Sequence, residues 1–261
     1  MADGHQATPD GTMHPMDLSA LGLIALVFLA AGAVKGISGM GLPTFSIALL
    51  GLFMPTATAA ALMLLPSLLT NVAQCIGPHA RTLARRLWPM WLLLVVVTVW
   101  SPLPDLGSAG SGARITLGVV LIFYGLWGLA RASLPDAGRW ALPVGGIAGA
   151  LSGVLTAATG VFVMPMVPFL QSLRLEKAVM IQALGLSFLL ATLALAARLG
   201  PQAVFSGATV PLTAHAVALL AAFAGLWGGA ALRQRLPLPV FQRALFGVFM
   251  ALGALMLVRA L

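Results

Sequence analysis

Lys35 is the only ionisable residue deep inside the first long apolar stretch of the chain. A charge within such a segment is costly, and residues of this kind usually mark a substrate path or pair with another group. The sequence predicts no buried acid nearby, so an anionic substrate is an attractive partner for the ammonium. The alternative is that Lys35 lies near a helix end and extends its side chain to the membrane surface.

Three polar residues follow in the next apolar segment, at spacings of i, i+4 and i+7. They are Ser67, Asn71 and Gln74, and in a helix they share one face. Their side chains are suited to coordinating substrate oxygens. The alternative is that they bond one helix to another, as Asn and Gln often do in membranes. The second half has a weaker counterpart, made of Gln182, Ser187 and Thr192.

The surroundings of Lys35 occur twice in the chain. Residues 31–43 are rich in glycine and hydroxyl side chains, and a similar run occupies 149–165. At a constant offset of 121 residues, Gly32 matches Gly153 and Gly39 matches Gly160. A helix that breaks inside a membrane frees backbone polar groups, so such a segment must line a cavity or pack tightly. Two broken segments at matching places in two halves are typical of transporters.

A helix is expected to restart after each break, with Pro43 and Pro165 near its first turns, where proline is tolerated. Two helix N-termini would then direct partial positive charge and free N–H groups at one central point, which favours an anion. The alternative is close packing of small residues between helices. The predicted substrate-binding residues are Lys35, Ser38, Gly39, Gly41, Pro43, Thr44, Asn71, Gln74, Thr156, Thr159, Gly160 and Phe162.

Composition determines the class of protein that can carry these features. Hydrophobic residues make up 60% of the 261 residues and charged residues 8%, and the mean hydropathy is +1.03. Such a chain cannot cover a water-soluble surface, so it is an integral membrane protein. Its apolar stretches are long enough to cross about 30 Å of hydrocarbon as helices. The expected place is the inner (plasma) membrane of a bacterial-type cell, as a multi-pass protein.

The predicted fold is all-α and polytopic, with two inverted repeats, each a broken re-entrant-type hairpin followed by three transmembrane helices. The expected domains are a disordered tail at 1–17, a first repeat at 18–131 and a second repeat at 139–261. The first repeat holds a broken segment at 18–52 and spans near 55–77, 87–103 and 113–131. The second holds a broken segment at 140–171 and spans near 176–197, 206–232 and 239–259.

The basic residues decide between two topologies. If each broken segment returns to its starting side, ten basic residues lie on one side of the membrane and three on the other; if each crosses once, the bias largely disappears. The positive-inside rule therefore favours hairpins, with oppositely oriented halves and both termini outside the cytoplasm. The ten are Arg81, Arg85, Arg86, Arg131, Arg139, Arg174, Lys177, Arg233, Arg235 and Arg243, and the three are Arg114, Arg198 and Arg259.

Several functions are excluded or made unlikely by what the chain lacks. Cys75 is its only cysteine, so it has no internal disulfide and no cysteine-rich metal site, and no metal or other cofactor is expected. The net charge of +8 comes from residues at the ends of apolar segments, so nucleic acid is not an expected partner. The expected partners are a small anionic substrate and the lipid bilayer, and a homodimer is left open.

The residues also resemble a known family. The run Val34–Pro43, with Leu65-Pro66 and Asn71–Gln74 after it, looks like the first half of the sulfite exporter TauE/SafE family of membrane transporters. The run Gly153–Pro165 looks like its second half, and the resemblance covers residues 18–260. It implies export or uptake of small sulfur-containing or organic anions, such as sulfite, sulfoacetate and related sulfonates.

The acids of the chain bear on the direction of transport. All six lie in the tail or near predicted span ends, so none is a buried proton relay, and His215 is the only titratable candidate inside a later span. A histidine bonded within the bundle is the simpler interpretation. A monoanion leaving an inside-negative cell gains about 2.3 kcal/mol per 100 mV, which favours export without a coupled ion.

Two alternatives remain at this stage. A passive anion channel would use the same helix ends without alternating access. Gly36-Ile-Ser-Gly39 also matches the G-x-S-G pattern of rhomboid intramembrane proteases, with His215 as the candidate base. The duplicated surroundings of Ser38 weigh against a protease, which has no need of them, and no catalytic residue is predicted.

Overall fold

The computed structural model describes residues 18–103, 110–130, 135–200, 210–233 and 235–260, and all regular structure in these ranges is helical. The predicted tail at 1–17 and part of the predicted loops lie outside them. The first half contains α1 (Leu18–Ser38), α2 (Leu42–Leu50), α3 (Thr56–Cys75), α4 (Ala80–Trp100) and α5 (Gly110–Leu129). The second contains a 3₁₀ turn (Gly138–Trp140), α6 (Ala141–Thr159), α7 (Met166–Ser172), α8 (Lys177–Leu199), α10 (Leu212–Leu232) and α11 (Leu238–Ala260).

Eight helices of the described ranges are long and apolar enough to cross a membrane. They include α1 and α6, the first arms of the two broken segments. The second arms, α2 and α7, have only 9 and 7 residues. The break in each segment is confirmed: α1 ends at Ser38 before Gly39, and α6 ends at Thr159 before Gly160.

The largest error in the predicted boundaries is the start of α4. The span was expected from residue 87, yet the helix begins at Ala80 and takes up Arg81, Arg85 and Arg86. These arginines are exposed, so their charges stay outside the apolar core while the backbone continues as helix. The helix also continues through Pro89.

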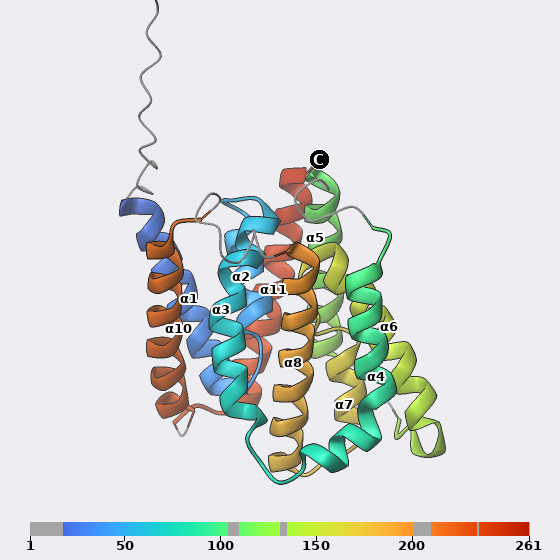
Figure 1. The fold of residues 1–261 in the computed structure, drawn as a ribbon. Coiled ribbons are helices and arrows are strands. Elements are labelled where there is room, and N and C mark those ends of the chain that lie inside the picture. The colour runs from blue at the N-terminus through green and yellow to red at the C-terminus, as the bar shows by residue number, and fades with distance from the viewer. Residues whose placement is uncertain (1–17, 104–109, 131–134, 201–209, 234, 261) are drawn as a thin grey trace, which may run out of the picture.

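Pairs of helices pack closely where glycines face a neighbouring backbone. A Cβ built on Gly32 of α1 would lie 2.2 Å from the carbonyl oxygen of Ala222 in α10, and one on Gly149 of α6 would lie 2.1 Å from that of Met90 in α4. Only glycine permits such an approach between membrane helices. In Figure 1, α1 and α10 lie together at one edge of the bundle and α4 and α6 at the other, with α3 and α8 between them.

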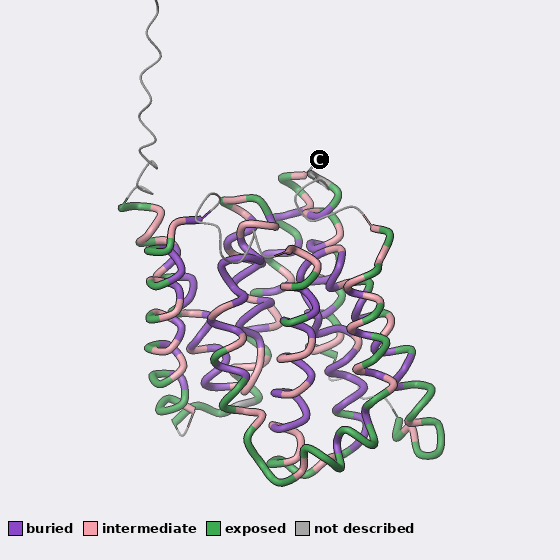
Figure 2. Tube along the Cα trace, in the orientation of Figure 1, coloured by how far each residue is buried: buried purple, intermediate pink, exposed green. Residues whose placement is uncertain are grey.

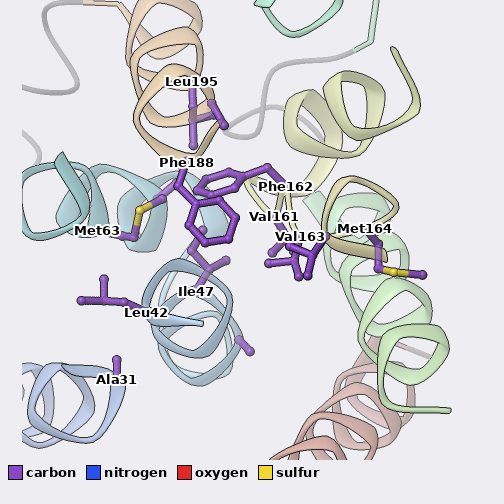
Figure 3. Packing of buried hydrophobic residues seen from close by; sticks show 14 of the residues in the cluster. Ala31, Leu42, Ile47, Met63, Val161, Phe162, Val163, Met164, Phe188 and Leu195 are labelled. Carbon is purple, nitrogen blue, oxygen red and sulfur yellow. The ribbon is translucent and has the colours of Figure 1, made fainter. Parts of the chain in front are cut away.

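The buried residues gather where the middle helices meet α2 and the second break, while the outer faces of α4, α6 and α10 are largely exposed (Figure 2). Phe162 packs against Phe188 of α8 with ring centroids 5.4 Å apart. Figure 3 shows both rings beside Ile47 of α2 and Met63 of α3. This apolar centre therefore joins the two halves of the chain.

A second tie between the halves lies near the end of α4. The Arg198 guanidinium, in the last turn of α8, donates hydrogen bonds to the carbonyl oxygens of Thr98 (3.2 Å), Ser101 (3.0 Å) and Leu103 (2.6 Å). Carbonyls at the C-terminus of a helix lack intrahelical partners, and a cation satisfies them. Arg198 is thus a structural residue of the fold.

Candidate functional site

Lys35 lies in the last turn of α1 and its side chain is only 2% exposed. Its Nζ donates a hydrogen bond of 2.9 Å to Thr70 Oγ1 and another to Asn71 Oδ1, both on α3. Both acceptors are neutral, and no ion pair of Lys35 with a described residue is present. Lys35 does lie near a helix end, as the alternative predicted, but its side chain turns toward α3 and is buried instead of extending to the surface.

The polar face of α3 continues this hydrogen-bond network toward α8. Asn71 Nδ2 donates to Ser67 Oγ at 3.2 Å, and Ser67 Oγ shares a hydrogen bond of 3.1 Å with Thr192 Oγ1 of α8. Ser67, Asn71 and Thr192 are all fully buried. The face thus bonds helix to helix, and through Asn71 it also orients the amino group of Lys35.

Gln74 joins the face to the first break. Its Nε2 donates a hydrogen bond of 3.0 Å to the carbonyl oxygen of Gly39, the residue that follows α1. Its Oε1 is buried and has no hydrogen-bond partner. Since an unmade hydrogen bond of a buried acceptor costs free energy, this oxygen is available for a donor on a ligand or a water.

The two breaks have the same local geometry. Ser38 Oγ donates to the carbonyl oxygen of Val34 and accepts from the N–H of Met40, and Thr159 Oγ1 does the same with Leu155 and Val161. The next residues, Gly39 and Gly160, have φ of +82° and +75°. Each glycine therefore ends its helix in the left-handed region, where a side chain would be strained.

A cavity of about 320 Å³ lies beside Lys35. Gln74 and Thr70 of α3, the turn 77–79 and Gln182 of α8 line it together with Lys35. The turn connects α3 to α4 at the end of the bundle opposite the end of α11 (Figure 1). A cavity at this end, with the Lys35 amino group and two glutamine side chains in a largely apolar wall, is suited to hold a small anion.

Gln182 closes the side of this cavity. Its Nε2 donates to the carbonyl oxygens of Cys75 (2.9 Å) and Gly77 (2.8 Å), and its Oε1 accepts from the N–H of His79 (3.1 Å). These three bonds hold the α3–α4 turn against the first turns of α8. Sequence reasoning gave Gln182 little weight, because the contact depends on a turn 103 to 107 residues away.

The second break lies elsewhere. A Cβ built on Gly160 would meet Ile47 Cδ1 at 3.0 Å, Ala60 Cβ at 3.6 Å and Leu195 Cδ2 at 3.7 Å. Ala60 is in the second turn of α3, while Gln74, which holds Gly39, is in its last turn. At 1.5 Å per residue this separates the two breaks by about 20 Å along α3. Gly160 also contacts Ile47, in the second turn of α2, so the convergence of both helix N-termini at one central point stays a prediction.

The remaining predicted site residues divide between these two places. Gly41 precedes α2 with φ of +99°, Pro43 is in the first turn as expected, and Thr44 Oγ1 is buried without a partner. Thr156 Oγ1 donates to the Ser152 carbonyl and faces its own helix. The structure thus brings Lys35, Gly39, Asn71 and Gln74 together, and Thr156, Thr159, Gly160 and Phe162 lie apart from them.

Thr70 is the site residue that sequence reasoning missed. It lies three residues after Ser67 and one before Asn71, so the helical spacing itself placed it beside the predicted face. Its hydroxyl is 1% exposed, donates to the Pro66 carbonyl at 2.6 Å and accepts from Lys35. No cluster of three or more His, Cys, Asp or Glu side chains that could hold a metal is present in the part of the chain that the structure describes.

The protease alternative is wrong on geometry. Ser38 Oγ bonds to backbone groups of its own chain segment, while Gly36, two residues earlier, packs against Leu226 to Ala230 of α10. His215 is in the first turn of the same helix, so at least three helical turns, about 16 Å, separate it from Ser38. Its Nδ1 lies 3.4 Å from the Pro211 carbonyl oxygen, within its own helix.

The fold and the site together define a multi-pass helical membrane protein with a polar site inside the bundle, which is the class of membrane transporters. Residues 24–256 match the model of the sulfite exporter TauE/SafE family. The match covers most of the chain, so the chain belongs to this family: it is a membrane transporter of sulfite-type anions and not an enzyme. No curated protein and no solved structure matches the chain.

Proposed function

We propose that this protein exports small sulfur-containing or organic anions, of the sulfite, sulfonate or sulfoacetate type, across the cell membrane. The observation that carries the proposal is the buried Lys35 amino group beside the 320 Å³ cavity. It is the one buried lysine among the described residues, and its partners Thr70 and Asn71 carry no charge to neutralise it. An anion in the cavity would supply that charge.

The remaining donor of the Lys35 ammonium supports an oxyanion ligand. An ammonium has three N–H donors, and two of those of Lys35 are used by Thr70 and Asn71, which leaves one for a ligand. We place the substrate at the first break, next to Lys35, Gly39 and Gln74. The second break matches the first in local geometry and has no contact with the substrate in this proposal.

The arrangement of helices supports an inverted repeat. In such a repeat, α1 corresponds to α6, α3 to α8, α4 to α10 and α5 to α11. The contact between α1 and α10 then has a counterpart in a contact between α6 and α4, and both contacts are present. The pair α5 and α11 corresponds to itself. There, Gly118 approaches the backbone oxygen of Gly253 and Gly253 approaches that of Gly118, as expected for two elements related by a two-fold axis.

The basic side chains support one orientation in the membrane. Most arginines occur at one end of the bundle (Figure 1). At this end lie the last turns of α3 and α10 and the first turns of α4, α6, α8 and α11. The start of α1 and the end of α11 lie at the opposite end. By the positive-inside rule the arginine-rich end is cytoplasmic. The Lys35 cavity is at that end, where an exporter takes up its substrate.

The membrane potential supports export as the favoured direction. Neither of the acids in the described residues, Asp136 and Glu176, lies within a spanning helix, so these ranges offer no carboxylate for proton coupling. A monoanion leaving an inside-negative cell gains about 2.3 kcal/mol per 100 mV, and a dianion about twice as much. This gain alone would maintain an outward concentration gradient.

Flux measured in liposomes that contain the purified protein tests the proposal. Sulfite, two-carbon sulfonates, thiosulfate and sulfate are compared with and without an imposed potential. We expect flux of the sulfite or sulfonate class that a potential of the correct sign accelerates. No flux of any of these anions, or selective cation flux, would overturn the proposal. Flux that does not saturate with concentration would instead identify a passive anion channel.

A further inference from the structure

A second cavity, of about 340 Å³, shares no lining residue with the cavity beside Lys35. It is enclosed by the last turns of α5, the short helix α7 and the first turns of α11, with Met40 of the break in its wall. None of the proposed substrate contacts of Lys35, Gln74 or Gly39 lies in this wall. The cavity is therefore distinct from the proposed substrate site.

The polar groups of this second cavity are mostly hydrogen-bond donors. Arg243 lines it and is exposed, and it makes no ion pair or hydrogen bond with a described residue. Trp127 also lines it, and its Nε1 is buried without a hydrogen-bond partner. The amides of Gln171 and Gln242 complete the polar part, and no carboxylate occurs among the lining residues that the structure describes. A guanidinium and an unpaired indole N–H together select an oxyanion.

The inner wall of the cavity is rigid and aromatic. Tyr124 contacts Phe246 edge to face with ring centroids 5.3 Å apart, and it contacts Phe249 at 5.6 Å. The Tyr124 hydroxyl faces Met40 Sδ at 4.0 Å. These contacts hold the wall in place, so the cavity is preformed and can bind its ligand with little cost of ordering.

The outer surface around the cavity is apolar. Phe123 and Leu126 of α5 are 57% and 50% exposed, and Val240 of α11 is 62% exposed. On a membrane protein such a surface faces the acyl chains of lipids. Arg243 and Trp127 lie at the arginine-rich end of these helices, which is where arginine and tryptophan meet lipid headgroups. Basic pockets between transmembrane helices near the cytoplasmic face are known to bind acidic lipid headgroups.

We propose that this cavity binds the phosphate group of an anionic membrane lipid, with Arg243 as the counter-charge and the indole N–H of Trp127 as a hydrogen-bond donor. The glycerol part of the lipid lies against the aromatic wall, and its acyl chains follow the apolar face of α5 and α11. Because Met40 belongs both to this wall and to the first break, a bound lipid supports the segment that carries Gly39. The site does not depend on which anion the protein transports.

Native mass spectrometry of the full-length protein in detergent tests the lipid site, with phosphatidylglycerol and phosphatidylcholine added separately. We expect retention of phosphatidylglycerol in preference to phosphatidylcholine. Arg243→Gln should lower that retention about fivefold, the factor expected for the loss of one arginine near an anionic lipid. Trp127→Phe removes the N–H and keeps an aromatic ring, so it should lower retention by a smaller factor.

Arg235→Gln is the matched control, since Arg235 is exposed near the same end of the bundle but does not line the cavity. Equal retention in the Arg243 and Arg235 variants would overturn the proposal. Competition of inorganic phosphate or sulfite with the lipid at equal concentration would also overturn it, because a free oxyanion would then be the occupant. If Arg243→Gln does not fold, Trp127→Phe against Arg235→Gln provides the comparison, and equal retention in these two variants would overturn the proposal. Anion flux through Lys35 is measured separately, so failure of either proposal leaves the other open.

Discussion

The amino group of Lys35 donates a hydrogen bond of 2.9 Å to the hydroxyl of Thr70, and this contact joins the end of α1 to the last turns of α3. The hydroxyl also donates to the Pro66 carbonyl at 2.6 Å, so its lone pairs are oriented toward the ammonium. A cation buried in this way is held by dipoles alone. It therefore remains able to attract an anion from the adjacent cavity.

Replacement of Lys35 by methionine should reduce anion flux by roughly ten- to a hundredfold, because a charge-assisted hydrogen bond is worth about 1.5–3 kcal/mol. The folded protein should remain, since Thr70 and Asn71 keep their other hydrogen bonds. Flux into liposomes at a fixed potential is the measurement. Lys177→Met is the control, because Lys177 is exposed at the start of α8. Equal flux in both variants would mean that Lys35 does not bind substrate.

The two break glycines should respond differently to substitution. Both have positive φ, so Gly39→Ala and Gly160→Ala should each cost about 1–2 kcal/mol of strain. A Cβ on Gly39 meets open space, whereas one on Gly160 also meets Ile47 at 3.0 Å. We expect a larger fall in melting temperature for Gly160→Ala than for Gly39→Ala. With leucine at each position, we expect a larger fall in flux per folded molecule for Gly39→Leu than for Gly160→Leu.

Gly39→Asn is the corresponding control, since asparagine tolerates the left-handed region better than alanine or leucine does. It should melt close to the unmodified protein. A melting temperature as low as that of Gly39→Leu would show that the backbone at Gly39 is not in the left-handed region.

Gly32→Ala should destabilise the bundle by about 1–3 kcal/mol, because the added methyl would lie 2.2 Å from the Ala222 carbonyl oxygen and force α1 and α10 apart. Gly22→Ala, in the same helix, meets no atom within 4 Å and should be neutral or slightly stabilising. Thermal unfolding of the two variants in one detergent makes the comparison. Equal melting temperatures would contradict the close packing of α1 on α10.

Gln182→Met should lower the melting temperature, because it removes three hydrogen bonds to the α3–α4 turn and leaves backbone groups of Cys75, Gly77 and His79 without this partner. We expect a cost of about 1–3 kcal/mol. Ile181→Met changes a neighbouring side chain of α8 without removing an amide and serves as the control. Proteolysis within the turn 77–79 should become faster in Gln182→Met alone.

His215→Ala should leave anion flux within about twofold of the unmodified protein. The His215 side chain is near the start of α10, its Nδ1 lies 3.4 Å from the Pro211 carbonyl oxygen, and it is far from Lys35 along the helix pair. The pH dependence of flux should be the same in both proteins. A loss of flux or a shifted pH profile would assign His215 a role in proton coupling that the geometry does not indicate.

Much of the architecture follows from local rules that the sequence obeys. Long apolar stretches must span as helices because only helices satisfy their own backbone in lipid, and the positions of Gly39 and Gly160 identify where helices end because a left-handed residue requires glycine. The start of α4 was harder to predict. The charges of Arg81 and Arg85 suggest an interhelical segment, yet a helix tolerates them wherever they remain outside the apolar core.

The sequence by itself determined that this is a helical membrane protein with two matching breaks, and it singled out Lys35 without deciding whether that side chain is buried. These properties depend on composition, on spacing and on residues close together in the chain. Only the tertiary structure decided that Thr70 and Asn71 hold Lys35, that Gln182 closes the cavity beside it, and that the two breaks lie about 20 Å apart along α3. These relationships depend on how helices pack, and packing brings together residues 35 to 107 positions apart that no local pattern connects.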